Sequence, residues 1–193
     1  MPTVAVVYFS AQGHTQQLAE AVAEGARSVP GTAVEVHRIV GEDIHNGRWK
    51  NPVITAALTA ADAIVFGTPT YMGGYAAQVK AFIDASSEQW MQQAWKDKVA
   101  AGFTHSLGLS GDKLATLTGL YVNAMQHGMV WVGPAVLVEG TAPTQVNRLS
   151  SYSGAMGQTD WGQEAANDGD KKTAAVLGKR VAEATARWVR GKA

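Results

Sequence analysis

The chain has 193 residues, 46% of them hydrophobic, so it is long enough for one sizeable core and short for two. Its 16 Lys and Arg residues balance its 16 Asp and Glu residues, which gives no indication of nucleic acid or an anionic membrane as a partner. The absence of Cys excludes disulfides, thiolate metal sites and thiol catalysis. No apolar stretch reaches membrane-spanning length, and the first residues belong to a predicted strand, so we expect a cytoplasmic protein.

The first predicted elements are a strand, a polar turn and a helix. Residues 4–9 are apolar throughout, which is typical of a parallel strand buried on both faces, and therefore of a central strand. A polar turn, residues 10–15, follows this strand. Apolar residues then recur every three or four positions, as in a helix that packs one face on a core: Leu18, Ala19, Val22, Ala23 and Ala26.

The turn at residues 10–15 lies at a predicted helix N-terminus, where unpaired backbone N–H groups and the helix dipole favour an anion. Ser10 and Thr15 offer hydroxyls, and Gly13 allows close backbone approach. The turn has no Lys or Arg and matches neither the nucleoside-triphosphate loop nor the dinucleotide loop. It predicts a cradle for a single terminal phosphate; the alternative is an ordinary turn in which Ser10 or Thr15 caps the helix.

The remaining elements alternate between strands and helices. We expect strands at residues 33–39, 63–67, 98–103 and 129–132, and helices at 53–60, 76–83, 114–126 and 170–189. The 33–39 strand alternates apolar and polar residues, as at a sheet edge. Residues 41–52 are polar and weakly structured, and residues 140–169 form a long polar loop of the kind that is usually functional or disordered.

This alternation predicts a single α/β domain over residues 1–193, with a doubly wound parallel sheet and helices on both faces. Polar, glycine-bearing turns follow the first, third and fourth strands, at residues 10–15, 68–74 and 104–112. Ligands in such sheets bind at the carboxyl ends of the strands, so we expect the three turns to form one site. A mononucleotide with a flat ring system fits, with phosphate at the first turn and the ring between the other two.

Several segments resemble the flavodoxin superfamily, and within it the WrbA-type NAD(P)H:quinone oxidoreductases and related FMN-dependent reductases. Residues 10–15 resemble the FMN phosphate loop, residues 67–73 the loop beside the isoalloxazine, and residues 126–129, Gln-His-Gly-Met, the segment whose His reaches the flavin site. The similarity covers nearly the whole chain. Two segments depart from the family: residues 110–113 read Ser-Gly-Asp-Lys instead of Gly-Gly-Gln-Glu, and residues 152–155 only loosely resemble Pro-Tyr-Gly-Ala.

The resemblance implies a flavodoxin-like five-stranded sheet of order 2-1-3-4-5, FMN as cofactor, and NADH or NADPH as co-substrate. The implied cofactor-binding residues are Ser10, Ala11, Gln12, Gly13, His14, Thr15, Pro69, Thr70, Tyr71, Met72, Gly73, Thr104, His105, Ser106, Gly108, Leu109, Ser110, Gly111 and His127. His127 would also be catalytic, as a hydrogen-bond partner of the flavin or of the acceptor; the alternative is a His that caps terminal carbonyls. No metal site is expected, because no His, Asp and Glu cluster has ligand spacing.

Trp90 and Trp95 lie five residues apart and cannot share one helix face, so core packing accounts for at most one of them. The resemblance places Trp90 against the flavin pocket of a neighbouring subunit, as a wall of the substrate slot. The alternative is that Trp90 packs on its own core. We therefore expect a homo-oligomer, either a dimer or a homotetramer.

Two classes of function are open at this stage. The first is a quinone reductase in which FMN takes hydride from NAD(P)H and passes two electrons to a quinone or a similar acceptor. The second is a non-catalytic flavodoxin-type electron carrier, or a module that binds FMN for partner recognition. A carrier that docks through charge needs a field that a net charge of zero does not supply, so the enzyme is favoured.

Overall fold

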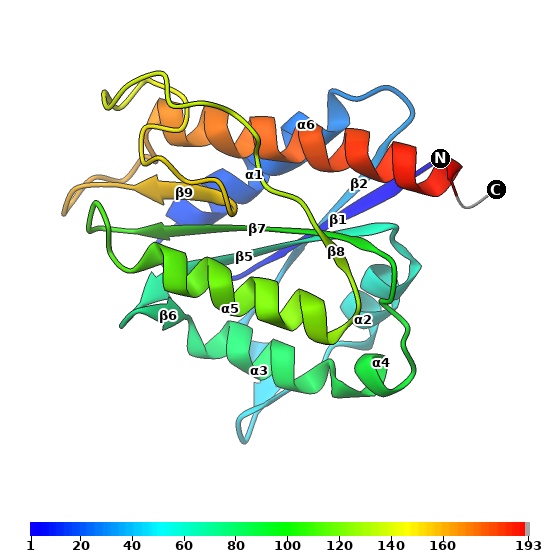
Figure 1. Cartoon of the computed structure of the whole chain (residues 1–193). Helices are drawn as coiled ribbons and strands as arrows, with labels where there is room; N and C mark the ends of the chain where they lie inside the picture. Colours follow the sequence, from blue (N-terminus) through cyan, green and yellow to red (C-terminus); the bar gives the residue numbers. More distant parts are fainter. Residues whose placement is uncertain (192–193) are drawn as a thin grey trace.

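The computed structural model of the protein describes residues 1–191 and contains one large sheet between two layers of helices (Figure 1). Its parallel strands are β1 (Thr3–Tyr8), β2 (Ala33–Arg38), β5 (Ala63–Tyr71), β7 (Val99–Ser106) and β8 (Val130–Trp131). They lie in the order β2-β1-β5-β7-β8, which confirms the predicted order 2-1-3-4-5 and the flavodoxin-like α/β fold.

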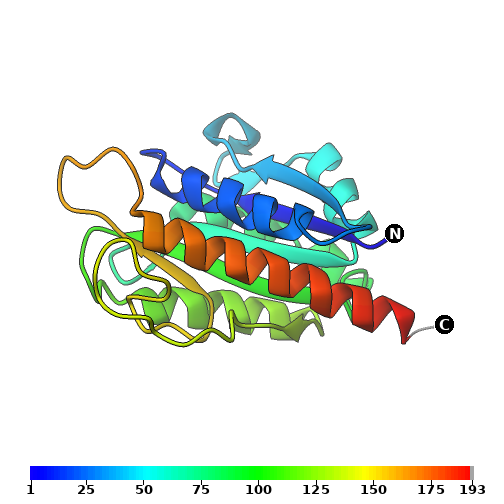
Figure 2. The ribbon, with the colours of Figure 1, turned by 90° about the horizontal axis from the view of Figure 1, so that it is seen from above.

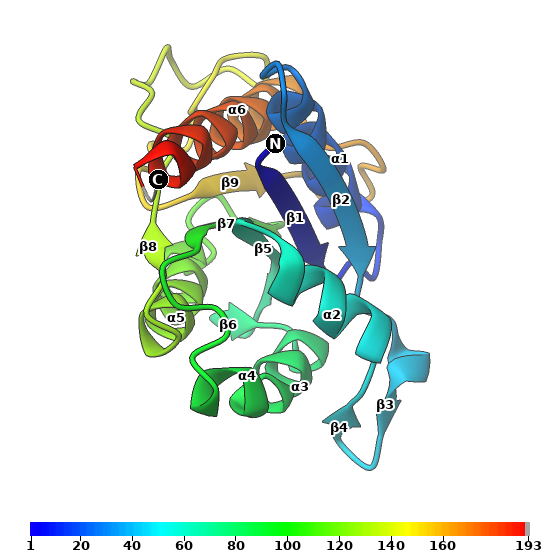
Figure 3. The same cartoon turned by 90° about the vertical axis from the view of Figure 1, so that its right-hand side faces the viewer.

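The strands are buried on both faces because alternate residues enter two separate cores. In β1, Val4 and Val6 pack with α1 (His14–Arg27) and α6 (Asp168–Arg190), whereas Ala5 and Val7 face the opposite side. That second core contains residues of α2 (Pro52–Ala60), α3 (Ala77–Ala85) and α5 (Lys113–Gln126). Figure 3 shows the sheet between these two layers of helices, and Figure 2 shows α1 and α6 running side by side over one face. An uninterrupted apolar strand is the expected sequence for this position.

The fifth position of the sheet is shared by two short strands. β8 pairs with the first residues of β7, and β9 (Ala155–Gln158) pairs in parallel with residues 103–106 of β7. The segment at residues 140–169, expected to be a loop, therefore contains a strand, and α6 begins at Asp168. A four-residue strand among Gly, Ser and Thr residues carries too little periodicity to be recognised in the sequence.

Smaller elements complete the architecture. The region at residues 41–52 forms a 3₁₀ turn (Gly41–Asp43) and the hairpin β3 (Ile44–His45) and β4 (Arg48–Trp49). β6 (Gly74–Tyr75) turns back antiparallel on the end of β5, and the short helix α4 (Ser87–Met91) follows α3. Among residues 1–191, no helix has both the length and the apolar character needed to cross a bilayer.

Candidate functional site

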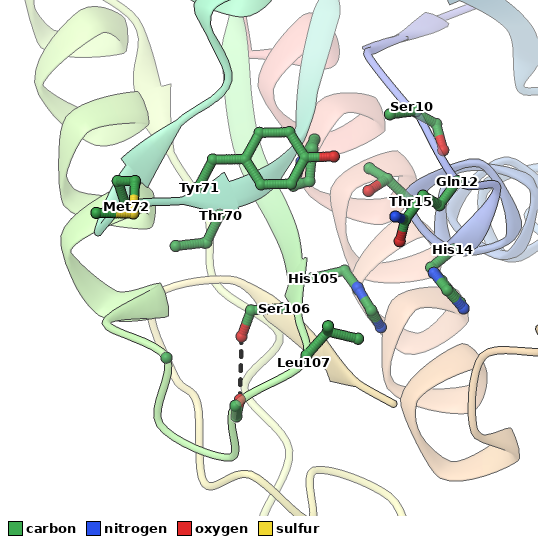
Figure 4. Close-up of a pocket in the computed structure, with 14 residues that line it drawn as sticks. Ser10, Gln12, His14, Thr15, Thr70, Tyr71, Met72, His105, Ser106 and Leu107 are labelled. Carbon is green, nitrogen blue, oxygen red and sulfur yellow. Dashed lines mark hydrogen bonds between the residues drawn. The ribbon is translucent and has the colours of Figure 1, made fainter. Parts of the chain in front are cut away.

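A pocket of about 540 Å³ opens at the carboxyl edge of the sheet, where the turns after β1, β5 and β7 meet (Figure 4). This is the edge at which parallel sheets bind ligands. Thirteen of the predicted cofactor-binding residues line it, together with Leu107: Ser10, Ala11, Gln12, His14, Thr15, Pro69, Thr70, Tyr71, Met72, His105, Ser106, Gly108 and Gly111. The structure thus assembles one site from three segments that are distant in sequence.

The first turn forms an open cradle at the N-terminus of α1. Gly13 is the N-cap residue with a φ of +92°, a left-handed conformation that suits glycine, and no side chain caps the first turn of the helix. The Ser10 hydroxyl accepts the Gly13 N–H at 3.1 Å, and the Ser10 and Thr15 side chains are both buried. The cradle therefore presents backbone N–H groups and two hydroxyls, which is the donor set expected for a phosphate.

Arg38, which the sequence analysis did not single out, supports this cradle from the end of β2. Its Nη2 donates a hydrogen bond to the Ser10 carbonyl oxygen at 2.7 Å. The turn itself has no cation, but the neighbouring strand supplies one beside it. Because β2 pairs with β1 in parallel register, Arg38 lies opposite Tyr8 and reaches the residues that follow β1. Only the strand pairing reveals this contact.

Two histidine rings stack at the floor of the pocket. The centroids of His14 and His105 are 4.6 Å apart with an interplanar angle of 10°. Nε2 of His14 lies 2.6 Å from the Gln163 carbonyl, and Nε2 of His105 lies 3.1 Å from the Thr159 hydroxyl. Burial, reinforced by the nearby His14, Lys113 and Arg148, lowers the pKa of His105 to about 3, so His105 is neutral near pH 7.

The end of β5 and the turn that follows it provide the apolar side of the pocket. Tyr71 is 46% exposed and Met72 is fully exposed, so both rest on the surface at the pocket rim (Figure 4). Met72 and Gly73 have φ values of +48° and +78°, and this tight turn leads the chain back into β6. Behind the rim, the Thr70 hydroxyl bonds to the hydroxyls of Thr104 and Thr116, each at 2.8 Å. Thr104 is fully buried and supports the wall without lining the cavity.

The third side of the pocket is the loop at residues 106–111. The Ser106 hydroxyl donates to the Gly108 carbonyl at 3.0 Å. Lys113, the first residue of α5, is completely buried, and its Nζ bonds to Ser106 Oγ, to the Gly108 carbonyl and to the Leu109 carbonyl. Leu109 and Ser110, although predicted as cofactor contacts, line a separate surface groove beside α5 instead. The pocket therefore meets both ends of this loop, residues 106–108 and Gly111, while the middle of the loop faces the other groove.

The structure does not bring His127 to this pocket. His127 follows α5, whose 14 residues separate it from the 106–111 loop by about 20 Å at 1.5 Å per residue. Its side chain is buried, its ring lies 4.4 Å from that of Trp95, and its Nε2 lies 3.0 Å from the Ser86 hydroxyl. Within one chain, His127 is thus a packed core histidine, and burial lowers its pKa to about 4.

The two tryptophans differ as their spacing suggested. Trp95 is buried in the core that contains Phe82, and its indole N–H donates to the Thr59 hydroxyl at 3.2 Å. Trp90 lies on α4 and is 45% exposed. Figure 1 shows α4 at the end of the molecule opposite to β6, so Trp90 does not reach the pocket of its own chain.

Across residues 1–191, no group of three His, Asp or Glu side chains is placed to hold a metal ion.

Comparisons with known proteins agree with this geometry. Residues 2–143 match the family model described as NADPH-dependent FMN reductase. Among curated relatives, Flavodoxin FldP of Pseudomonas aeruginosa is 37% identical over 187 residues, covering 94% of this chain and 96% of that protein. An NAD(P)H dehydrogenase (quinone) of Geotalea uraniireducens is 31% identical over 201 residues, covering 97% and 99% of the two chains.

A solved structure is similar to this chain over nearly its whole length. The flavodoxin, WrbA-like protein from Agrobacterium tumefaciens superposes with a TM-score of 0.77 at 41% sequence identity, covering 97% of this chain and 99% of that chain. The family match includes the turns after β1, β5 and β7, and hence all three sides of the pocket. The chain therefore belongs to the NADPH-dependent FMN reductase family.

Proposed function

We propose that the protein is an FMN-dependent oxidoreductase that takes hydride from NADH or NADPH and reduces a quinone or a similar two-electron acceptor. The observation that carries this proposal is the pocket itself. It joins an uncapped helix N-terminus with two buried hydroxyls to an exposed apolar rim, Tyr71 and Met72, at one sheet edge. The donor set fits a phosphate, and the rim fits a flat ring, as FMN requires.

The residues of this chain would bind and orient the cofactor. The cradle at residues 10–15 holds the phosphate, Thr70 is fixed from behind by Thr104 and Thr116, and the 106–111 loop is fixed by Lys113. Bound FMN supplies the hydride and electron chemistry. Because Tyr71 and Met72 lie at the open side of the pocket, they leave room for a second flat molecule to approach.

Steady-state oxidation of NADH and NADPH, with and without benzoquinone, tests the proposal. We expect the FMN-loaded protein to oxidise at least one of them and benzoquinone to increase the rate. The relative of Geotalea uraniireducens named NAD(P)H dehydrogenase (quinone) supports this expectation. Absence of turnover by protein that retains FMN would contradict it.

An electron carrier is the second candidate, because one relative at 37% identity is named Flavodoxin FldP. The net charge of zero argues against docking by a strong electrostatic field. The two functions differ in their electron donor: a carrier exchanges electrons with a partner protein and shows little direct oxidation of NAD(P)H. The same assay separates them.

The lack of Lys and Arg in the cradle leads to a cofactor test. The backbone amides and hydroxyls of the cradle are placed to bond to the phosphate of FMN. Riboflavin lacks this phosphate, so FMN should bind much more tightly than riboflavin. Fluorescence-quenching titrations of the apoprotein with the two flavins measure this difference. Equal affinities would show that the phosphate is not held at the cradle.

We also propose a cytoplasmic homo-oligomer, either a dimer or a tetramer, in which Trp90 reaches the pocket of a neighbouring subunit. Trp90 and Met91 are exposed together on α4, and such apolar patches mark interfaces more often than free surface. Sedimentation of the wild type, with turnover of Trp90→Ala at a concentration of known assembly, tests this. A fully active wild-type monomer, or an unassembled Trp90→Ala protein of normal activity, would contradict it.

A further inference from the structure

Lys113 combines burial with the absence of an ion pair. Its side chain is completely buried, and none of the salt bridges found within residues 1–191 includes it. The ammonium instead donates to one hydroxyl and two carbonyl oxygens, at 2.9 Å (Ser106), 2.6 Å (Gly108) and 2.9 Å (Leu109). A buried cation that forms no direct ion pair is costly, so its retention calls for an explanation beyond loop packing.

Charges of both signs lie near this ammonium. Lys113 is the first residue of α5 and lies at the positive end of that helix dipole. Arg148 adds a second positive charge, and Asp170, which pairs with Arg148 at 2.8 Å, has a larger and opposite effect on Lys113 without forming a salt bridge to it. Burial, partly offset by Asp170, lowers the pKa of Lys113 to about 8, so most of it remains charged at pH 7.

The pocket lies directly across the loop that Lys113 holds. All three acceptors belong to residues 106–109, and Ser106 and Gly108 line the cavity while Lys113 does not. Only one layer of backbone therefore separates the ammonium from the site. The protein between them screens the electrostatic field of the ammonium less than water would. Residues 110–113 depart from the family pattern at this point, so the resemblance gives Lys113 no role.

Bound FMN would supply chemistry that changes the charge in the pocket. Under the proposed function, hydride transfer would add two electrons and one proton to its neutral ring system and leave one negative charge there. We propose that Lys113 is a positioning residue whose ammonium, acting through the 106–109 loop, stabilises reduced FMN relative to oxidised FMN and so raises the reduction potential of the bound cofactor. This rests on the proposed FMN function.

The test compares the affinities of the oxidised and reduced cofactor. Lys113→Gln keeps a side chain that can donate to the Gly108 carbonyl but removes the charge. We expect the ratio of affinities, reduced over oxidised, to fall at least tenfold, which lowers the two-electron midpoint potential by about 30 mV. Dye-equilibrated redox titration measures the potential, and flavin titration of the apoprotein measures the oxidised affinity. Lys179→Met, which removes an exposed lysine of α6, should leave both unchanged.

A second pair of variants separates charge from loop support. Because the chain contains no Cys, Lys113→Cys offers a single thiol that can be alkylated in the unfolded chain before refolding with FMN. Treatment with 2-bromoethylamine restores an ammonium at nearly the lysine length, and iodoacetamide leaves a neutral amide. We expect the aminoethylated protein to recover the wild-type potential and the amide form to match Lys113→Gln.

Equal potentials for the charged and neutral forms would overturn the proposal, as would loss of oxidised FMN binding by Lys113→Gln and by both alkylated proteins. Either result would leave Lys113 with loop support alone. Failure of the wild type to bind FMN is a different outcome and would instead defeat the proposed function. The two failures are therefore distinguishable.

Discussion

At the scale of single residues, the backbone conformation of Gly13 shapes the proposed phosphate cradle. Its φ of +92° strains any other residue, and a Cβ there would enter open space beside the cradle. Gly13→Val should therefore reduce FMN affinity at least tenfold in a fluorescence titration, because the added side chain hinders approach to the backbone amides. The matched control is Gly31→Val, with a φ of +76° and equally open surroundings outside the pocket. Both variants should lower the melting temperature by similar amounts, and only Gly13→Val should lower the affinity for FMN.

His127 acts through packing in the structure of a single chain. Its ring is buried against Trp95 and bonds to the Ser86 hydroxyl, so its removal leaves a cavity and costs one buried hydrogen bond, while the Ser86 hydroxyl keeps its bond to the Ile83 carbonyl oxygen. His127→Ala should reduce the free energy of unfolding by about 2–4 kcal/mol, more than the loss of a helix cap. Urea denaturation measures this, with the exposed His45→Ala as control. A stable variant that loses acceptor-dependent turnover would instead support the catalytic role expected from the resemblance.

At the scale of elements, the packing of α1 on α6 depends on two glycines. A Cβ on Gly25 would lie 1.9 Å from the Ala175 carbonyl oxygen, and one on Gly178 would lie 1.9 Å from that of Val22. The helices therefore cross with their backbones in direct contact. Since neither backbone can move away without opening the core that contains Leu18 and Leu177, the close approach is fixed.

Gly178→Ala should consequently destabilise the protein despite the higher helix propensity of alanine. The overlap should cost about 1–3 kcal/mol, with a lower urea midpoint. The control is Gly41→Ala, because a Cβ at that position meets nothing within 4 Å and its φ is not positive. Gly41→Ala should leave the midpoint nearly unchanged. An unchanged midpoint for Gly178→Ala would mean that α1 and α6 can separate without loss.

At the scale of the whole molecule, two buried histidines make stability depend on pH. Burial lowers the pKa values of His105 and His127 to about 3 and about 4 in the folded protein, from 6.5 for the exposed side chain. Between these values and pH 6.5 the unfolded chain binds more protons than the folded one. The stabilisation is therefore complete above about pH 6.5 and is lost as the pH falls towards 4 and then 3.

Urea denaturation of the apoprotein at pH 7.5, 6 and 5 should show this decline. His45→Ala, which removes an exposed histidine, should show the same dependence as the wild type. A variant without His127 should show a weaker pH dependence, because the contribution of His127 is lost and that of His105 remains. A free energy of unfolding that stays constant from pH 7.5 to 5 would show that both histidines can take up protons without unfolding.

The sequence by itself determined the fold class, the strand order through the family resemblance, and most of the pocket. These features are local: a buried parallel strand is apolar at every position, and the turn that follows it must lie at the carboxyl edge. The pocket residues from 10–15, 69–72 and 105–111 therefore followed from three strand-to-turn boundaries. The family resemblance indicated that the ligand is FMN. The pattern of residues 10–15 independently indicated that the ligand carries a phosphate.

Only the tertiary structure decided which distant side chains support those turns. Arg38 reaches Ser10 through strand pairing, Lys113 folds back under its own loop, and His127 is carried to the other end of α5. β9 likewise exists because residues 103–106 of β7 offer it a free edge, and its own residues show no clear period. Such contacts depend on the relative placement of whole elements, which the periodicity of any one segment does not encode.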